Sequence, residues 1–238
     1  MTEVRLPEQH LIEVKETREV VTVRVWPVPI RIIHWTVFID TILLSITGFY
    51  IARPFIPVGS DPQFVMGWMR GLHQLAAWVF VASVGARLVF LWTGNRYTRW
   101  DHFIPVHRHR RVHVKEVLKY YLFLRRDPVH FAGHNPLAGL TYSVVFLMFL
   151  AQIVTGFALR DLAAPSAPFQ VLGGWIFSFW DPQTVRFVHH LVMWLTWGFV
   201  VHHVYSVTLM EWDERSGLLS SMLSGRKRIP RDRLKDLV

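Results

Sequence analysis

The chain has 238 residues, of which 52% are hydrophobic and 14% aromatic, and its mean hydropathy is +0.27. Soluble domains of this length seldom have such a composition, so a membrane protein is expected. The formal net charge of +9 would suggest nucleic-acid binding in a soluble protein. Here the basic residues lie between long apolar runs, which indicates contact with membrane lipid headgroups and no nucleic acid. The sequence has no cysteine, which excludes disulfides, thiolate-bound clusters and thioether attachment of a cofactor.

Four apolar segments are long enough to cross a bilayer, which takes roughly 20 helical residues. The first thirty residues are polar and lack the apolar core of a signal peptide, so they are expected to stay where the chain is made. The predicted fold class is all-α: an integral membrane four-helix bundle, residues 32–211, between an N-terminal tail, 1–31, and a basic C-terminal tail, 212–238. In chain order, the predicted membrane helices are residues 32–51, 67–92, 137–159 and 185–210.

The connections differ in character. Residues 112–126 are half apolar and carry four Lys or Arg, which predicts a helix lying at the membrane interface. Asn135 and Pro136 are expected to be the N-cap and first residue of the third membrane helix. Residues 163–174, with two prolines, are expected to form a loop.

Lysine and arginine are unevenly distributed along the chain. The segment through Arg31 has five, the connection between the second and third helices has nine, and the C-terminal tail has seven. The two remaining connections share only four. By the positive-inside rule, both termini and the basic connection are predicted to be cytoplasmic, in a multi-pass protein of a bacterial inner membrane.

Six of the 13 histidines lie in or at the ends of the predicted membrane helices. A polar side chain there is costly and is by default a candidate for function. The other seven lie in polar segments and are expected to be solvated. With no cysteine present, imidazole is the obvious candidate ligand for a metal or a haem. The six are His34, His73, His189, His190, His202 and His203.

The fourth helix carries two pairs of adjacent histidines, 189/190 and 202/203. The helical repeat shows which member of the first pair shares a face with which member of the second. At about 100° per residue, His189 and His203 differ by only about 40° around the axis. The other three combinations differ by about 120–140°. At about 1.5 Å per residue, His189 and His203 are about 21 Å apart along the axis. That is the spacing expected for two haems stacked across the bilayer, each near one membrane surface.

Each haem needs a second axial ligand at matching depth. His34 begins the first helix and His203 ends the fourth, so both are expected near the cytoplasm. His73 and His189 both lie near the outer side. We therefore predict two non-covalent haems b with axial iron ligands in the pairs His34/His203 and His73/His189. The third helix has no histidine and is expected only to pack.

Three further residues follow from the same phase argument. Arg87 is 14 residues after His73 and is predicted to meet a haem propionate, with snorkelling to the interface as the alternative. Gly48 is 14 residues after His34 and is predicted to let a porphyrin approach, with a helix–helix contact as the alternative. Asp40 lies about 9 Å deeper than His34 and is expected to be protonated or paired, without an axial role.

Several short motifs, each weak alone, occur in order between about residues 24 and 228. The motifs are Pro29–Trp35, Thr47–Ile51, Met66–His73, Gly94–Tyr97, Gly133–Pro136, Thr155–Ala158, His189–Trp194 and His203–Tyr205. Together they resemble the cytochrome b subunit of membrane-bound, periplasm-facing nickel–iron hydrogenases. The chain departs from that family's usual pattern at Asp40, at His202 and after His203.

The resemblance implies axial ligation by the same four histidines. It also implies a nickel–iron hydrogenase, with small and large subunits, as partner, and electron transfer from the small subunit to a membrane quinone. Such a chain is an electron-transfer subunit of a hydrogen:quinone oxidoreductase without hydrogen chemistry of its own.

Other functions stay open. Related dihaem cytochromes serve formate dehydrogenases and thiosulfate reductases, or act as stand-alone quinol oxidoreductases. An ion transporter or a membrane anchor, with histidines for zinc or for packing, belongs to a different class, and a visible spectrum separates it from a haem protein.

The outer connections carry few charges and several aromatic residues. Trp68, Trp175, Phe177 and Trp180 are expected near that surface. Such a surface suits an apolar protein contact, so we predict that a redox partner docks there and that the outer haem is reduced first. The alternative is an interfacial aromatic belt.

Overall fold

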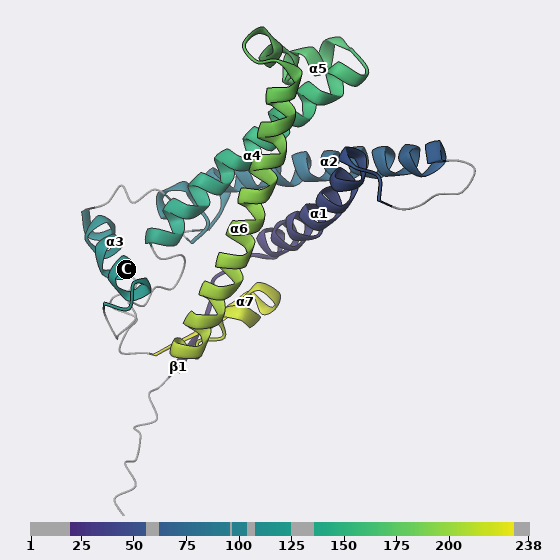
Figure 1. Ribbon diagram of the computed structural model, residues 1–238. Coiled ribbons are helices and arrows are strands. Elements are labelled where there is room, and N and C mark those ends of the chain that lie inside the picture. Colours follow the sequence, from purple (N-terminus) through teal and green to yellow (C-terminus); the bar gives the residue numbers. More distant parts are fainter. Residues whose placement is uncertain (1–19, 56–61, 96, 104–107, 125–135, 231–238) are drawn as a thin grey trace, which may run out of the picture.

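The computed structural model describes residues 20–55, 62–95, 97–103, 108–124 and 136–230 (Figure 1). Four helices in this part of the chain are long and apolar enough to cross a membrane, which confirms the predicted all-α membrane bundle. Each extends a few residues beyond its predicted bounds, because hydropathy marks only the part of a helix that suits hydrocarbon. They are α1 (Val28–Ala52), α2 (Pro62–Thr93), α4 (Pro136–Ala163) and α6 (Pro182–Glu214).

The helix ends follow ordinary capping chemistry. Asp181 caps α6: its carboxylate accepts hydrogen bonds from the backbone N–H groups of Gln183 and Thr184, at 2.9 and 3.1 Å. Pro136 is the first residue of α4, where its missing N–H costs nothing. Its predicted N-cap, Asn135, lies outside the described residues.

Short helices connect the membrane helices. The expected helix at residues 112–126 is present as α3, Arg108–Tyr121, displaced toward the N-terminus. The loop prediction for residues 163–174 is wrong, because α5 (Ala167–Leu172) forms there with Pro168 in its first turn, where proline is favourable. The remaining short helices are the 3-10 helices η2 (Trp100–His102) and η3 (Gly174–Ser178), and α7 (Leu218–Ser224).

A small sheet joins the two ends of the described chain. β1 (Val20–Arg24) pairs antiparallel with β2 (Arg226–Pro230), with Thr22 opposite Arg228. The Asn95 side chain, after α2, donates to the carbonyl of Val25 at 2.9 Å. The segments before α1, after α2 and after α6 therefore meet at one end of the molecule, called here the sheet end. Figure 1 shows α6 running from the end that carries α5 to the sheet end.

The membrane helices pack as two pairs. α1 packs mainly along α2, and α4 packs mainly along α6. Side chains connect the pairs: the Trp197 indole donates to the Ser45 hydroxyl at 2.8 Å, and the rings of Phe80 and Phe149 lie 5.0 Å apart. The four candidate ligands come from three helices. His34 and His73 belong to the α1–α2 pair, and His189 and His203 belong to the α4–α6 pair.

Candidate functional site

His34 and His203 come together from α1 and α6 near the sheet end. Their ring centroids are 6.3 Å apart, and the ring planes are inclined at 57°. With metal–nitrogen bonds of about 2 Å, two imidazoles on opposite sides of one iron have ring centres about 6 Å apart. The observed separation therefore suits two rings that share one iron.

The surroundings of this pair are mainly aromatic. His203 stacks on Phe199 with a centroid distance of 5.5 Å, and its Nδ1 lies 3.2 Å from the Tyr142 hydroxyl of α4. Trp35 lies edge-on to His34 at 5.3 Å. Nδ1 of His34 is buried and has no hydrogen-bond partner among the described residues. The pair is thus held from three helices, with one ring nitrogen left unsatisfied.

His73 and His189 form a second site toward the α5 end. Nδ1 of His73, on α2, lies 2.9 Å from the hydroxyl oxygen of Thr47, on α1. Nδ1 of His189, on α6, lies 2.8 Å from the hydroxyl oxygen of Thr155, on α4. The two rings are close enough to interact electrostatically. The structure therefore brings together the members of both histidine pairs singled out from the sequence.

Two glycines leave room for these rings. A Cβ placed on Gly48 would lie 3.4 Å from Cε1 of His73, and one on Gly156 would lie 3.5 Å from Cε1 of His189. Any side chain larger than alanine would press on the imidazole. Gly48 thus has a packing role at His73, while its predicted role in porphyrin approach remains a prediction.

The third membrane helix contributes more than packing. The expectation that α4 only packs is wrong: Thr155 contacts His189, and Tyr142 contacts His203. The sequence held a signal for one of these contacts, because Thr-Gly-Phe occurs at residues 47–49 and again at 155–157. No comparable signal pointed to Tyr142.

Arg87 lies on α2 near the His34–His203 level. Its guanidinium is over the ring of Phe103, 4.8 Å from the centroid, and Nη2 donates to the carbonyl of Thr98 at 3.2 Å. Phe103 in turn packs on Tyr142, the residue that contacts His203. Nη1 of Arg87 is buried without a hydrogen-bond partner in the described part of the chain. A buried donor of this kind suits an anionic group such as a propionate.

His190, His202 and Asp40 are the other membrane-helix residues singled out from the sequence, and the His190 ring lies 6.4 Å from that of its neighbour His189, centroid to centroid. His190 bonds through Nδ1 to the Arg186 carbonyl at 2.9 Å, and the exposed His202 lies 3.4 Å from the Ser206 hydroxyl. Both contacts are within α6. Asp40 is buried, and its Oδ2 has no hydrogen-bond partner in the ranges that the structure describes.

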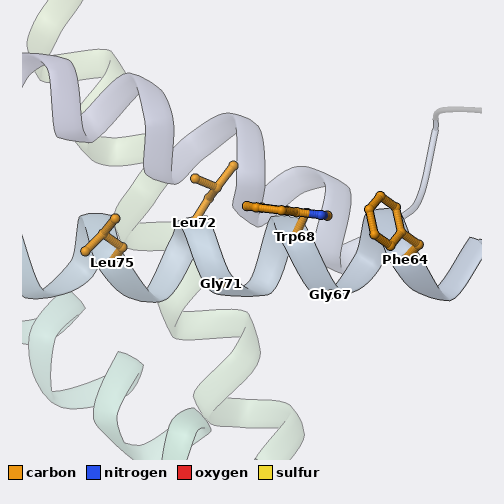
Figure 2. Close-up of a pocket in the computed structure, with 6 residues that line it drawn as sticks. All are labelled: Phe64, Gly67, Trp68, Gly71, Leu72 and Leu75. Carbon is orange, nitrogen blue, oxygen red and sulfur yellow. The ribbon is translucent and has the colours of Figure 1, made fainter.

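A shallow apolar groove runs along the face of α2 that lies opposite His73 (Figure 2). A Cβ on Gly67 or Gly71 would meet nothing within 4 Å. His73 is two residues beyond Gly71, about 160° around the helix, so the groove is separate from the histidine site. Figure 2 shows the lining residues along this face: Phe64, Gly67, Trp68, Gly71, Leu72 and Leu75.

The aromatic residues expected at the outer surface differ in their exposure to solvent. Trp68, Trp175 and Trp180 are 59%, 50% and 42% exposed. Phe177 instead packs against the buried cluster of Ala158, Ile176 and Val185. The exposed aromatic surface at this end therefore includes these tryptophans together with Phe179, which is 78% exposed, and Phe177 belongs to the core.

The residues present fit a haem held without covalent attachment. The donors are imidazoles in pairs, the first pair is spaced for a shared iron, and a buried arginine has a free donor for an acidic substituent. Fold and site together define the class of protein: a membrane cytochrome of the b type.

Comparison with known proteins places the chain within that class. It belongs to the prokaryotic cytochrome b561 family, whose model matches residues 25–225. A protein of Bradyrhizobium diazoefficiens named "Probable Ni/Fe-hydrogenase B-type cytochrome subunit" is 37% identical over 87% of this chain and 86% of its own. A Cupriavidus necator protein of the same name is 33% identical, covering 84% and 85%. The Escherichia coli K12 "Probable Ni/Fe-hydrogenase 1 B-type cytochrome subunit" is 32% identical, covering 89% and 93%. These relatives confirm the resemblance seen in the motifs.

Proposed function

We propose that this chain carries electrons from a periplasm-facing nickel–iron hydrogenase to the quinone pool of a bacterial inner membrane. The observation that carries the proposal is the pairing of histidines at two levels of one bundle. Because His189 and His203 are 14 residues apart on α6, the two levels are about 21 Å apart. The names of the relatives support a hydrogenase as the partner.

The four histidines would hold two haems b. His73 and His189 would ligate the outer haem, and His34 and His203 the inner one. Each bound haem supplies a one-electron carrier whose potential depends on its ligands and surroundings. The chain supplies neutral imidazoles, apolar surroundings that exclude water, and the Arg87 guanidinium to receive a propionate of the inner haem.

The orientation rests on charge and on where the basic segments lie. The segments before α1, after α2 and after α6 meet at the sheet end, and they contain most of the Lys and Arg. The positive-inside rule puts that end and both termini in the cytoplasm. The His73–His189 level is then the outer one, close to the exposed tryptophans of η3 and the α5 end.

This orientation gives the direction of electron flow. The exposed Trp175 and Trp180 form an apolar surface that suits docking of the hydrogenase small subunit. Electrons would enter at the outer haem, pass to the inner haem, and leave to quinone.

The test is purification of the full chain from native membranes through an affinity tag. We expect a nickel-containing large subunit to co-purify, two haems b per chain, and reduction of both haems by hydrogen. Co-purification of a molybdenum-containing dehydrogenase instead would replace the hydrogenase with the formate dehydrogenase type of partner. A preparation without Soret and α bands would contradict the assignment to electron transfer altogether.

A further inference from the structure

The Thr-Gly-Phe sequence builds the same local arrangement twice. In α1, the Thr47 hydroxyl oxygen lies 2.9 Å from Nδ1 of His73, and Gly48 lies against the same ring. In α4, the Thr155 hydroxyl oxygen lies 2.8 Å from Nδ1 of His189, and Gly156 lies against that ring. In each case a threonine on one helix of a packed pair reaches a histidine on the other helix.

The hydrogen of each threonine hydroxyl is already used within its own helix. A hydroxyl has one hydrogen to donate, and a carbonyl oxygen can only accept. Thr47 donates to the carbonyl of Leu43 at 2.7 Å, and Thr155 donates to the carbonyl of Ala151 at 2.6 Å. Each hydroxyl oxygen therefore has only lone pairs to offer to the neighbouring imidazole.

We propose that Thr47 and Thr155 are positioning residues that accept the Nδ1–H of His73 and His189, so that each ring presents its Nε2 lone pair to the haem iron. The opposite tautomer would leave no hydrogen between Nδ1 and the hydroxyl oxygen, and it would put a hydrogen on the nitrogen that must bind the metal. An acceptor on the far nitrogen fixes the orientation of a metal-binding histidine and raises its basicity. This inference rests on the proposed function, because it concerns the ligands of the outer haem.

Both threonines are well placed for such a role. Thr47 is 1% exposed and Thr155 is 3% exposed, so water does not replace the hydroxyl as an acceptor. Loss of either hydroxyl should therefore leave the Nδ1–H of the neighbouring histidine without this acceptor.

The inner pair is built differently. Nδ1 of His34 has no hydrogen-bond partner among the residues described, and Nδ1 of His203 faces the phenol of Tyr142 at 3.2 Å. Among the described residues, neither ring contacts a threonine that donates its hydroxyl hydrogen to a backbone carbonyl. Removal of Thr47 and Thr155 hydroxyls should consequently change the outer haem and leave the inner haem as it is.

The experiment uses the full chain, purified with its haems in detergent. Thr47→Val and Thr155→Val keep the side-chain shape and remove the acceptor, while Thr47→Ser and Thr155→Ser restore it. Thr41→Val and Thr141→Val are matched controls on the same helices, because these threonines also donate to the carbonyl four residues back but have no hydrogen bond to a histidine in the described part of the chain. The readouts are haem retention against excess apomyoglobin and a redox titration of the α band. His73→Ala identifies which redox component is the outer haem.

We expect each valine variant to bind the outer haem about ten- to a hundredfold less tightly, as is usual for loss of a histidine's outer hydrogen bond. We also expect a higher midpoint potential for that haem, because a less basic imidazole stabilises the ferric state less. The serine variants should restore both properties, and the controls should match the wild type. If His73→Ala removes one haem but both valine variants retain haem at wild-type potential, the inference is overturned and the proposed function stands. If His73→Ala retains both haems, the ligand assignment fails and the inference fails with it.

Discussion

The imidazole ring centroids of His34 and His203 lie 6.3 Å apart, with His34 near the start of α1 and His203 about two thirds of the way along α6. The first and last membrane helices are also joined just beyond these rings by the β1–β2 pairing. The inner site is therefore closed by β1 and β2, the first and last strands of the described chain. Its ligands are ordered only when the first and last membrane helices have packed together.

Loss of either inner ligand should halve the haem content. We expect His34→Ala and His203→Ala to contain one haem b per chain where the wild type contains two, because an iron with a single strong axial ligand binds less firmly. The pyridine haemochrome assay measures this ratio. His202→Gln is the matched control, since His202 is exposed and contacts Ser206 of its own helix. Loss of a haem in that control would show that the phase of α6 differs from the one described.

Electron entry should depend on the outer pair. His73→Ala should remove the outer haem and stop the transfer of electrons from the partner to quinone, while the inner haem still binds and is still reduced by dithionite. The measurement is hydrogen-driven quinone reduction by the purified complex. His190→Gln should retain full activity, because His190 bonds to the Arg186 carbonyl. Partner-driven quinone reduction without the outer haem would contradict entry from the periplasmic side.

Arg87 should tune the inner haem. Removal of a buried positive charge beside a propionate stabilises the ferric state, so Arg87→Met should lower the midpoint potential of the inner haem. Arg87→Lys keeps the charge, and the midpoint potential of its inner haem should lie between those of the wild type and Arg87→Met. A redox titration that finds both potentials unchanged in Arg87→Met would mean that Nη1 meets no haem propionate.

Replacement of the glycines beside the outer ligands by residues with large side chains should disturb the outer site. We expect Gly48→Leu and Gly156→Leu to displace the imidazoles of His73 and His189, at a cost of about 1–3 kcal/mol in stability, and to lose the outer haem. Gly67→Leu is the control, because a side chain there projects into the open groove of α2. The readouts are haem content and thermal unfolding. Equal behaviour of Gly48→Leu and Gly67→Leu would remove the packing role assigned to Gly48.

The N-cap of α6 should make stability depend on pH. Hydrogen bonds from the Thr184 hydroxyl, and then from the backbone N–H groups of Thr184 and Gln183, lower the pKa of Asp181. A carboxylate whose pKa is lower in the folded state stabilises the fold above its ordinary pKa, and this contribution is lost as the pH falls through the lowered value. Asp181→Ala should therefore lower the unfolding temperature at neutral pH, with a difference that shrinks in acid.

The control for this cap is Asp181→Asn, which keeps an oxygen acceptor without a titrating charge. Its unfolding temperature, followed by far-ultraviolet circular dichroism in detergent, should lie between those of Asp181→Ala and the wild type at neutral pH, because the amide oxygen accepts the hydrogen bonds without the charge. A difference between wild type and Asp181→Ala that stays constant from neutral to strongly acid pH would contradict the role of the carboxylate.

Much of the site could be predicted because it depends on one helix at a time. The separation of His189 from His203, and of Arg87 from His73, follows from the helical repeat and needs no knowledge of neighbours. The depth of each histidine follows from where its apolar segment begins or ends. The phase argument also excluded His190 and His202, which the structure places on contacts within α6.

What could not be predicted lies between helices. Hydropathy marks α4 as a membrane helix without showing that Thr155 and Tyr142 face the histidines of α6. The pairing of β1 with β2 joins segments from opposite ends of the sequence, which were expected to be two separate tails. The short helix α5 packs against α4, and the sequence with Pro165 before it and Pro168 in its first turn suggested only a loop.

Hydropathy was therefore sufficient for the four membrane helices, and helical periodicity and depth selected His34 and His203, whose rings the structure brings together. The charge-based topology and the ligation of haem by the four histidines stay predictions. The tertiary structure decided which hydroxyl meets each ring nitrogen, which glycines lie beside the rings, and how the chain ends close the sheet end. The physical reason is that lipid-facing and helix-facing residues are equally apolar, so the sequence of a membrane helix carries little information about its rotation relative to its neighbours. That rotation is set by close packing, and it brought Thr47 to His73 and Thr155 to His189.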